Sequence, residues 1–368
     1  MQYPHNPLIK ALLAPFSLLY GIGVFVRNLC FSCGIFTSRE FPFPVISVGN
    51  ITVGGTGKTP HVEFLVSLLK DHFSIAVLSR GYKRKSSGFV VASTVSGVRD
   101  IGDEPLQMKR KFPDVEMAVD GNRVRGIVNL SRYNRKVNTV ILDDAFQHRW
   151  VKPGITILLV DYHRPVTSDS LLPAGRLREF ASARKRAGIV IVTKCPSGIK
   201  PIERRIIAKE LDLIAWQSLY FTTIVYGDPV PVFTGGIPFP EREELKAMNS
   251  QILMVTGIVS PGHLKQHLSV ISPVAAHLDF PDHHSFSKRD AGKIGRVWNS
   301  FEGGRKLIVT TEKDAMRLRE IGNYIDDEIK INMYYIPIKI SFVDDDGELF
   351  KNQILNYVRN NKRDGILY

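Results

Sequence analysis

Short, continuous apolar runs alternate along the chain with longer segments of helical character. Continuous apolar runs bounded by Gly, Pro or charged residues are typical of strands that are buried on both faces. The predicted strands cover residues 44–50, 75–79, 115–119, 138–144, 155–161, 188–194, 251–259 and 306–314. The predicted helices cover residues 60–70, 104–112, 123–133 and 204–215. This alternation predicts an α/β fold with a parallel sheet covered by helices on both faces.

At 368 residues, the chain is long enough for one or two domains. Residues 220–240 are rich in β-formers, Gly and Pro, which is typical of a ribbon or linker. Strands that lead into helices follow, so we expect a second, smaller α/β unit. The expected divisions are an N-terminal membrane segment 1–40, a core 41–219, a β-ribbon linker 220–245, a second α/β domain 246–342 and a C-terminal tail 343–368.

The N-terminal stretch Ala11–Val26 carries no charge. It is shorter than the roughly 20 residues of a membrane span, and Pro15, Gly21 and Gly23 interrupt it. We therefore expect an interfacial helix that lies in one leaflet of a membrane. The alternative is a helix packed on the protein's own core. A signal peptide is disfavoured because no clear cleavage site is found.

The net charge of +13 suits nucleic acid, an anionic membrane or a phosphorylated substrate. No nucleic-acid recognition motif accompanies the charge, so we expect no nucleic-acid partner. Three cysteines make a poor disulfide framework, and the chain is expected to be intracellular. Cys30 and Cys33 form a CxxC pair in an apolar stretch, without the second ligand pair that zinc needs.

The segment "SVGNITVGGTGKTP", residues 47–60, combines the end of a predicted strand, a glycine cluster and the start of a helix. The strict pattern GxxxxGK[ST] fails only at its first position, which holds Thr. The glycines let backbone amides turn toward an anion at a helix N-terminus. The lysine would reach the β- and γ-phosphates, and the last threonine would bind Mg²⁺. The loop residues are Thr52, Val53, Gly54, Gly55, Thr56, Gly57, Lys58 and Thr59.

A pair of carboxylates, Asp143 and Asp144, ends the predicted strand 138–144. Ligands of α/β sheets bind at the carboxyl ends of strands, so one carboxylate is expected to hold a metal through water. The alternative is a solvated strand end. The segment "AFQHR" follows directly and brings further polar side chains to the same edge.

Two other polar groups are less specific. Asp103 and Glu104 precede Pro105 in "IGDEP", where a carboxylate could simply cap a helix. His283 and His284 in "FPDHHSF" could form a metal site, a proton relay or plain surface. From the residues alone, the surface interpretation is favoured.

Eight segments in this order resemble one family: "SVGNITVGGTGKTP", "LSRGYKR", "GDEP", "LDDAFQHR", "LLPAGRLRE", "VTGI", "FPDHHSF" and "TTEKDAMRL". Together they resemble the tetraacyldisaccharide 4'-kinases (LpxK) of lipid A biosynthesis, over about Leu8 to Leu318. The chain departs from the commonest family form at Ala145, where Gly is frequent, and at Arg176, where Pro is frequent. Neither departure removes a functional group.

The resemblance implies transfer of the ATP γ-phosphate to the 4'-hydroxyl of a tetraacylated disaccharide 1-phosphate, which gives lipid IVA. It implies ATP and Mg²⁺ as cofactors, and a P-loop domain joined by a β-ribbon to a second α/β/α domain. It places the enzyme peripherally on the cytoplasmic face of the bacterial inner membrane. The lipid A precursor and the membrane surface are then its partners, and we expect a monomer.

The resemblance also implies roles for single residues. Asp103 is similar to the base that deprotonates the sugar hydroxyl, and His283 to its partner, with His284 left as an alternative. Lys58, Asp144 and Arg123 are expected to act on the transferring phosphate. The expected metal-binding residues are Thr59, Asp143 and Asp144. The expected substrate-binding residues are Glu104, Gln147, Arg178 and Glu179.

The main rival is a membrane-associated regulatory ATPase of the MinD/ParA type, which also carries a GGxGKT loop. Those proteins have a signature lysine before the glycines, where this chain has Val53. Their cycle consumes ATP without a small-molecule acceptor. Transfer of phosphate to lipid would therefore distinguish the lipid kinase from the regulatory ATPase.

Overall fold

A computed structural model describes residues 7–361, and these divide into two compact units. The first unit contains residues 7–94, Met108–Ile224 and 340–361, and the second contains Val95–Gln107 and Val225–Lys339. The short segment Val95–Gln107 therefore belongs with the second unit, although first-unit residues flank it. The predicted core 41–219 did not separate this segment, because nothing in its local pattern marks a change of unit.

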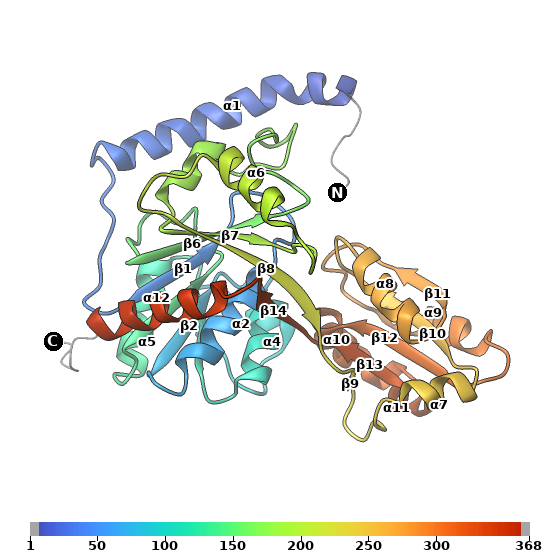
Figure 1. The fold of residues 1–368 in the computed structure, drawn as a ribbon. Helices are drawn as coiled ribbons and strands as arrows, with labels where there is room; N and C mark the ends of the chain where they lie inside the picture. The colour runs from blue at the N-terminus through green and yellow to red at the C-terminus, as the bar shows by residue number, and fades with distance from the viewer. Residues whose placement is uncertain (1–6, 362–368) are drawn as a thin grey trace. The chain divides into compact units, whose positions relative to one another are not determined.

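The first unit is built on a nine-stranded sheet in the order β14-β8-β7-β6-β1-β5-β2-β4-β3 (Figure 1). The central pairs from β4 to β8 are parallel, and β3 pairs antiparallel with β4. Every residue of β1, β2, β5 and β7 is buried, so helices and loops cover both faces. The strands are β1 Val45–Gly49, β2 Ile75–Ser79, β3 Val90–Val91, β4 Glu116–Val119, β5 Thr139–Asp143, β6 Ile155–Asp161, β7 Ile189–Thr193, β8 Ser218–Tyr226 and β14 Ile338–Phe342.

Helices connect these strands as the sequence pattern predicts. Ile127 and Leu130 of α5 pack with alternate apolar residues of β2, β4 and β5 in one core cluster. Helix α6 begins at Pro201 and ends before Asp212, whose φ of 43° is left-handed. It is thus shifted toward the N-terminus relative to the predicted 204–215. The helices are α1 Pro7–Ser32, α2 Lys58–Leu69, α5 Arg123–Tyr133, η1 Ala181–Arg186, α6 Pro201–Leu211 and α12 Asp346–Asn361.

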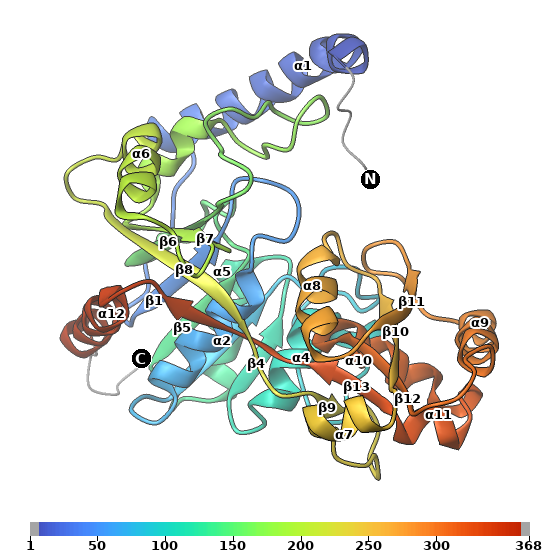
Figure 2. The same ribbon diagram turned by 45° about the vertical axis from the view of Figure 1, so that its right-hand side comes forward.

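The second unit has a five-stranded sheet in the order β11-β10-β12-β13-β9 (Figure 2). All neighbouring pairs are parallel except β13 with β9. Its strands are β9 Val230–Pro231, β10 Gln251–Thr256, β11 Val274–Asp279, β12 Lys306–Thr311 and β13 Met333–Ile336. Its helices are α3 Val98–Ile101, α7 Arg242–Ala247, α8 Gly262–Ile271, α9 Lys288–Asn299, α10 Glu312–Leu318, η2 Arg319–Tyr324 and α11 Asp327–Ile331, and α4 Asp103–Lys111 begins within it.

The predicted linker 220–245 contains most of β8, which is a neighbour of β14 in the first sheet although β14 comes more than a hundred residues later. Within the described residues, the predicted tail 343–368 contains α12, which buries Phe350, Ile354 and Val358 in the first unit. The α12 side chain Tyr357 also bonds Val45 through its hydroxyl, which lies 3.3 Å from the Val45 nitrogen and 3.4 Å from its oxygen.

Helix α1 is continuous from Pro7 to Ser32, so Pro15 and the two glycines do not end it. An added Cβ at Gly21 would lie 2.9 Å from a methyl carbon of Leu171, so glycine is what lets the helix approach the first unit closely. Figures 1 and 2 show α1 along one end of this unit. Its length and composition are sufficient to cross a membrane, and only 11% of its most apolar window is buried.

Candidate active site

The glycine-rich loop joins β1 to the start of α2, as the sequence predicts. Gly54 and Gly57 have φ angles of 106° and 82°, which side chains on L-residues rarely adopt. Helix α2 begins at Lys58, directly after Gly57. The loop therefore presents backbone amides and a helix N-terminus together, which is the arrangement that binds phosphate.

Side chains outside the loop hold it in shape. Asn50 Nδ2 donates to Thr56 Oγ1 at 2.8 Å, and Thr193 Oγ1 donates to the Thr56 carbonyl at 3.0 Å. Lys194 donates both to the Gly55 carbonyl and to Asp161 Oδ2, the latter at 2.7 Å. Because these bonds fix the loop carbonyls, they also fix the direction of the amides. The sequence pattern indicated no role for these four side chains, which are Asn50, Asp161, Thr193 and Lys194.

His61 fastens the base of the loop. Its Nδ1 lies 2.7 Å from the Gly57 carbonyl, and its Nε2 lies 3.1 Å from Thr222 Oγ1 of β8. The side chain is buried, and burial lowers the pKa of His61 to about 4, although its hydrogen bond to the Gly57 carbonyl raises the pKa. A neutral ring can donate through one nitrogen and accept through the other. His61 thus connects the end of the loop to β8.

Asp144 forms ion pairs with two cations beside the loop. Lys58 Nζ lies 3.7 Å from Asp144 Oδ1, and Arg178 Nη1 lies 3.1 Å from the same atom. Arg178 also donates to Gln147 at 3.4 Å, and Gln147 donates to the Asn50 carbonyl at 2.6 Å. Burial raises the pKa of Asp144, but the charges of Lys58 and Arg178 outweigh it and lower the pKa overall. The structure thus brings four predicted site residues into one group.

Asp143 and Arg123 lie deeper than predicted. Asp143 is 1% exposed and accepts from Ser79 Oγ at 2.8 Å. Arg123 is also 1% exposed, and its guanidinium donates to the carbonyls of Asp120 at 2.7 Å, Asp143 at 3.1 Å and Asp144 at 3.4 Å. As placed, Arg123 braces the carboxyl end of β5. Its predicted contact with the transferring phosphate stays a prediction.

The residues at this edge fit a nucleotide-bound magnesium ion. Among residues 7–361, no group of three His, Cys, Asp or Glu side chains is placed to hold a metal by itself. Magnesium keeps several waters and takes its other oxygens from one or two side chains and from phosphates. Thr59 on the loop and Asp144 beside Lys58 supply that kind of donor set.

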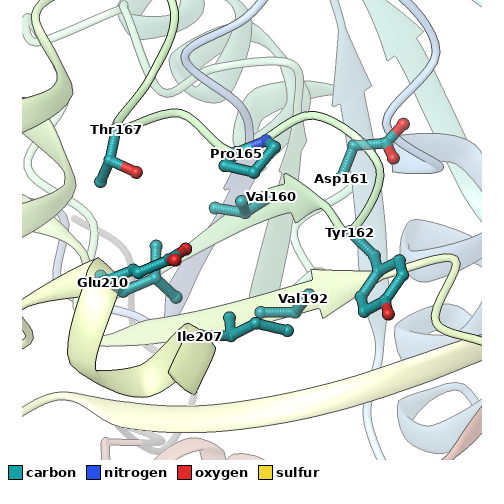
Figure 3. Close-up of a pocket in the computed structure, with 9 residues that line it drawn as sticks. Val160, Asp161, Tyr162, Pro165, Thr167, Val192, Ile207 and Glu210 are labelled. Carbon is teal, nitrogen blue, oxygen red and sulfur yellow. The ribbon is translucent and has the colours of Figure 1, made fainter. Parts of the chain in front are cut away.

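A small, mostly apolar hollow of about 20 Å³ lies at the carboxyl ends of β6 and β7, next to α6 (Figure 3). Asp161, which also accepts from Lys194, connects it to the loop. Its lining residues are Val160, Asp161, Tyr162, Pro165, Thr167, Val192, Ile207, Glu210 and Leu211.

The second unit contains the other predicted pair. Asp103 is the first residue of α4 and is 4% exposed. Its Oδ2 lies 3.0 Å from His283 Nδ1 and also accepts from Arg317, at 3.2 Å from Nε and 2.5 Å from Nη2. Its Oδ1 accepts from the Glu104 nitrogen at 3.0 Å. Burial raises the pKa of Asp103, but the bond from His283 and the charges of Lys313 and Arg317 hold the pKa well below its usual range.

His283 has a φ of 58°, a left-handed conformation that costs energy for a residue with a side chain. Its backbone nitrogen donates to the Gly257 carbonyl at 3.3 Å. The neighbouring His284 turns away, stacks on Phe280 and bonds Asp290 at 3.1 Å. Of the two histidines, His283 is therefore the one that contacts Asp103.

Helix α10 supplies two cations that sequence reasoning did not assign. Lys313 and Arg317 are four residues apart, so they lie on one face of the helix. Lys313 Nζ lies 2.9 Å from Glu104 Oε1 and 3.0 Å from His283 Nε2. Both cations belong to the segment "TTEKDAMRL", which carried the family resemblance without a role for either residue.

Glu179, an expected substrate-binding residue, contacts α1 instead of the loop group. Its carboxylate is fully buried and pairs with Arg27 at 2.9 Å and with Arg186 at 2.7 Å. Asn28 donates to it at 3.3 Å. These contacts join the N-terminal helix to the first unit, and the substrate role of Glu179 stays a prediction.

Comparisons with known proteins identify the family. A family model described as tetraacyldisaccharide-1-P 4'-kinase (LpxK) matches residues 9–359. A tetraacyldisaccharide 4'-kinase of Phocaeicola vulgatus is 50% identical over 357 residues, 96% of this chain and 97% of the relative. One of Bacteroides thetaiotaomicron is 49% identical over 365 residues, 98% and 96% of the two chains. A crystal structure of LpxK from Aquifex aeolicus in complex with ATP superposes with a TM-score of 0.72 at 28% identity, covering 95% of this chain and 99% of that one. The chain therefore belongs to the LpxK family of tetraacyldisaccharide 4'-kinases.

Proposed function

We propose that this kinase transfers the γ-phosphate of ATP to the 4'-hydroxyl of a tetraacyldisaccharide 1-phosphate, as a step of lipid A biosynthesis. Two features support the proposal: the first unit contains a phosphate-binding loop that leads into Lys58, and the second unit contains a buried Asp103–His283 pair. The first supplies charge to the transferring phosphate, and the second supplies a proton acceptor for an alcohol. The membership of the LpxK family fixes the class of substrate.

In the proposed site, the loop amides and Lys58 bind the phosphates of ATP. Mg²⁺, held by Thr59 and through water by Asp144, would neutralise charge on the β- and γ-phosphates. Arg178 orients Asp144, since its guanidinium contacts both carboxylate oxygens at 3.1 and 3.2 Å.

The hydrogen bonds favour His283 as the proton acceptor and Asp103 as the group that orients it. Asp103 receives donors on both oxygens, and its depressed pKa makes it a poor base. An Nδ1–H directed at Asp103 leaves the lone pair of the ring on Nε2. The O–H bond of the acceptor breaks as Nε2 takes its proton. The oxygen then bonds to the γ-phosphorus, and the bond to the β–γ bridging oxygen breaks to release ADP.

Helix α1 is the proposed membrane anchor. Side chains such as Leu12 and Leu18 are 72% and 67% exposed, which leaves a long apolar surface beside a chain of charge +13. Because the acceptor is an acylated lipid, we propose that the kinase works from the cytoplasmic face of the inner membrane. We also propose a monomer, as the family resemblance leads us to expect.

One assay tests the proposal. The purified protein is incubated with γ-labelled ATP, Mg²⁺ and tetraacyldisaccharide 1-phosphate dispersed in detergent, and label in the lipid is measured. We expect labelled lipid from the wild type and none from Lys58→Ala, with Lys70→Ala, an exposed lysine after the same helix, as the control. Release of free phosphate without labelled lipid would instead support a regulatory ATPase.

A further inference from the structure

Lys313 makes a contact that the family's name does not explain. Its ammonium lies 3.0 Å from His283 Nε2, 2.9 Å from Glu104 Oε1 and 3.9 Å from Asp103 Oδ2. An ammonium has three N–H donors and no lone pair, so it can only donate to the ring nitrogen. The nitrogen that has to take a proton in the reaction therefore already has its lone pair in use.

We propose that Lys313 occupies the Nε2 lone pair of His283 until the acceptor hydroxyl replaces it, and so keeps the base from activating water. The inference rests on the proposed role of His283 as the proton acceptor. It assigns Lys313 as a positioning residue that couples ATP consumption to the presence of lipid.

The surroundings of Lys313 allow it to exchange partners. Its side chain is 20% exposed, and that of Glu104 is 24% exposed, so neither is enclosed. Burial lowers the pKa of Lys313, but the carboxylates of Glu104 and Asp103 raise it overall, and the side chain stays an ammonium. When a hydroxyl takes the lone pair, Glu104 still holds the ammonium nearby. The charge then lies beside the oxygen that is losing its proton, which favours the alkoxide.

A purely structural role for Lys313 is poorly supported by the same contacts. Arg317 already neutralises Asp103 through two bonds, so Lys313 is not needed to balance that charge. Asp103 and the Gly257 carbonyl already hold the side chain and backbone of His283. The contact of Lys313 with His283 Nε2 differs from these contacts because it occupies the basic nitrogen of the ring.

The test compares two products of one reaction mixture. ATP hydrolysis without lipid and phosphate transfer to tetraacyldisaccharide 1-phosphate are measured for Lys313→Met, which keeps the length of the side chain and removes its charge. We expect hydrolysis without lipid to rise about tenfold or more, within the range of a positioned base. Transfer to lipid should fall. Lys313→Arg, which keeps a donor, should recover part of the coupling. Lys330→Met on α11 controls for loss of another partly exposed lysine that pairs with a carboxylate.

The double variant Lys313→Met with His283→Ala gives the decisive result. If the added hydrolysis comes from the uncovered base, it should disappear in the double variant. Unchanged hydrolysis in a folded Lys313→Met protein, or a rise that survives loss of His283, would overturn the inference. If Lys313→Met does not fold, Glu104→Gln is used instead, because it removes the carboxylate that holds the ammonium. A His283-dependent rise in ATP hydrolysis without lipid is expected in that variant too. Its absence would count against the inference.

The two proposals fail in different ways. If wild-type protein labels no lipid, the proposed function fails, whatever Lys313→Met does to hydrolysis. If wild-type protein labels lipid normally and Lys313→Met shows no His283-dependent hydrolysis, only the role of Lys313 fails.

Discussion

Arg317 donates to a single oxygen of Asp103 through two nitrogens, Nε at 3.2 Å and Nη2 at 2.5 Å, and both side chains are buried. A buried carboxylate that loses such a partner keeps a charge it cannot solvate, at a typical cost of about 3–5 kcal/mol. We therefore expect Arg317→Met to lower the free energy of unfolding by about that amount, measured in urea. Arg289→Met, at an exposed position on α9, is the control. Equal urea midpoints for the two variants would contradict the assignment.

Asp103 and His283 should behave as one unit in catalysis. Because Asp103 orients the ring whose Nε2 takes the proton, Asp103→Asn and His283→Ala should each lower kcat by about 10² or more. The double variant should be scarcely slower than either single variant. ATP affinity, measured separately by equilibrium binding, should change little. Losses that add in log kcat would show that the two residues act independently.

The exposed side of α1 should control membrane binding without affecting the fold. Leu12, Phe16 and Leu19 are 72%, 59% and 66% exposed, so their replacement by Gln removes apolar surface and no internal packing. We expect the triple variant to bind anionic phospholipid vesicles much more weakly in a flotation assay, with normal ATP binding. The control replaces exposed Ile202 and Ile206 of α6 by Gln. Equal flotation of the two variants would show that another surface provides the anchor.

His61 should make the first unit sensitive to acid. Its pKa is about 4 in the folded protein and 6.5 as the reference for an unperturbed histidine, so the unfolded chain binds the proton more readily between these values. The contribution of His61 to stability is complete above pH 6.5 and is lost as the pH falls toward 4. It amounts to about 3 kcal/mol. Urea unfolding of wild type and His61→Gln across this range should give a smaller pH dependence for the variant, and parallel curves would refute the claim.

The sequence predicted the features that depend on neighbours along the chain. The loop from Thr52 to Thr59 was recognisable because a P-loop is one continuous segment between a strand and a helix. The buried strands were recognisable because both faces of a parallel sheet are apolar. These features were enough to predict the α/β fold and the phosphate-binding loop.

The features that sequence reasoning missed depend on distant contacts. Asp103 and Arg317 are 214 residues apart, and no local pattern around either residue indicates the other. Lys313 follows a strand, as many surface lysines do, and only its contact with His283 Nε2 distinguishes it. Lys194 was predicted to be the last residue of a strand. In the structure its φ of 58° is left-handed, and its side chain donates to the Gly55 carbonyl of the loop.

The hydrogen bond of Tyr357 to Val45 joins residues that are 312 positions apart, so the first strand is held by a helix that is synthesised long after it. During synthesis, β8 emerges long before its neighbour β14 and presents an unpaired sheet edge for that interval. The nascent chain therefore holds a phosphate loop and an open edge before it can close the sheet. A truncation before Ile338 would remove β14 and leave this edge permanently exposed, so such a truncation should cause aggregation.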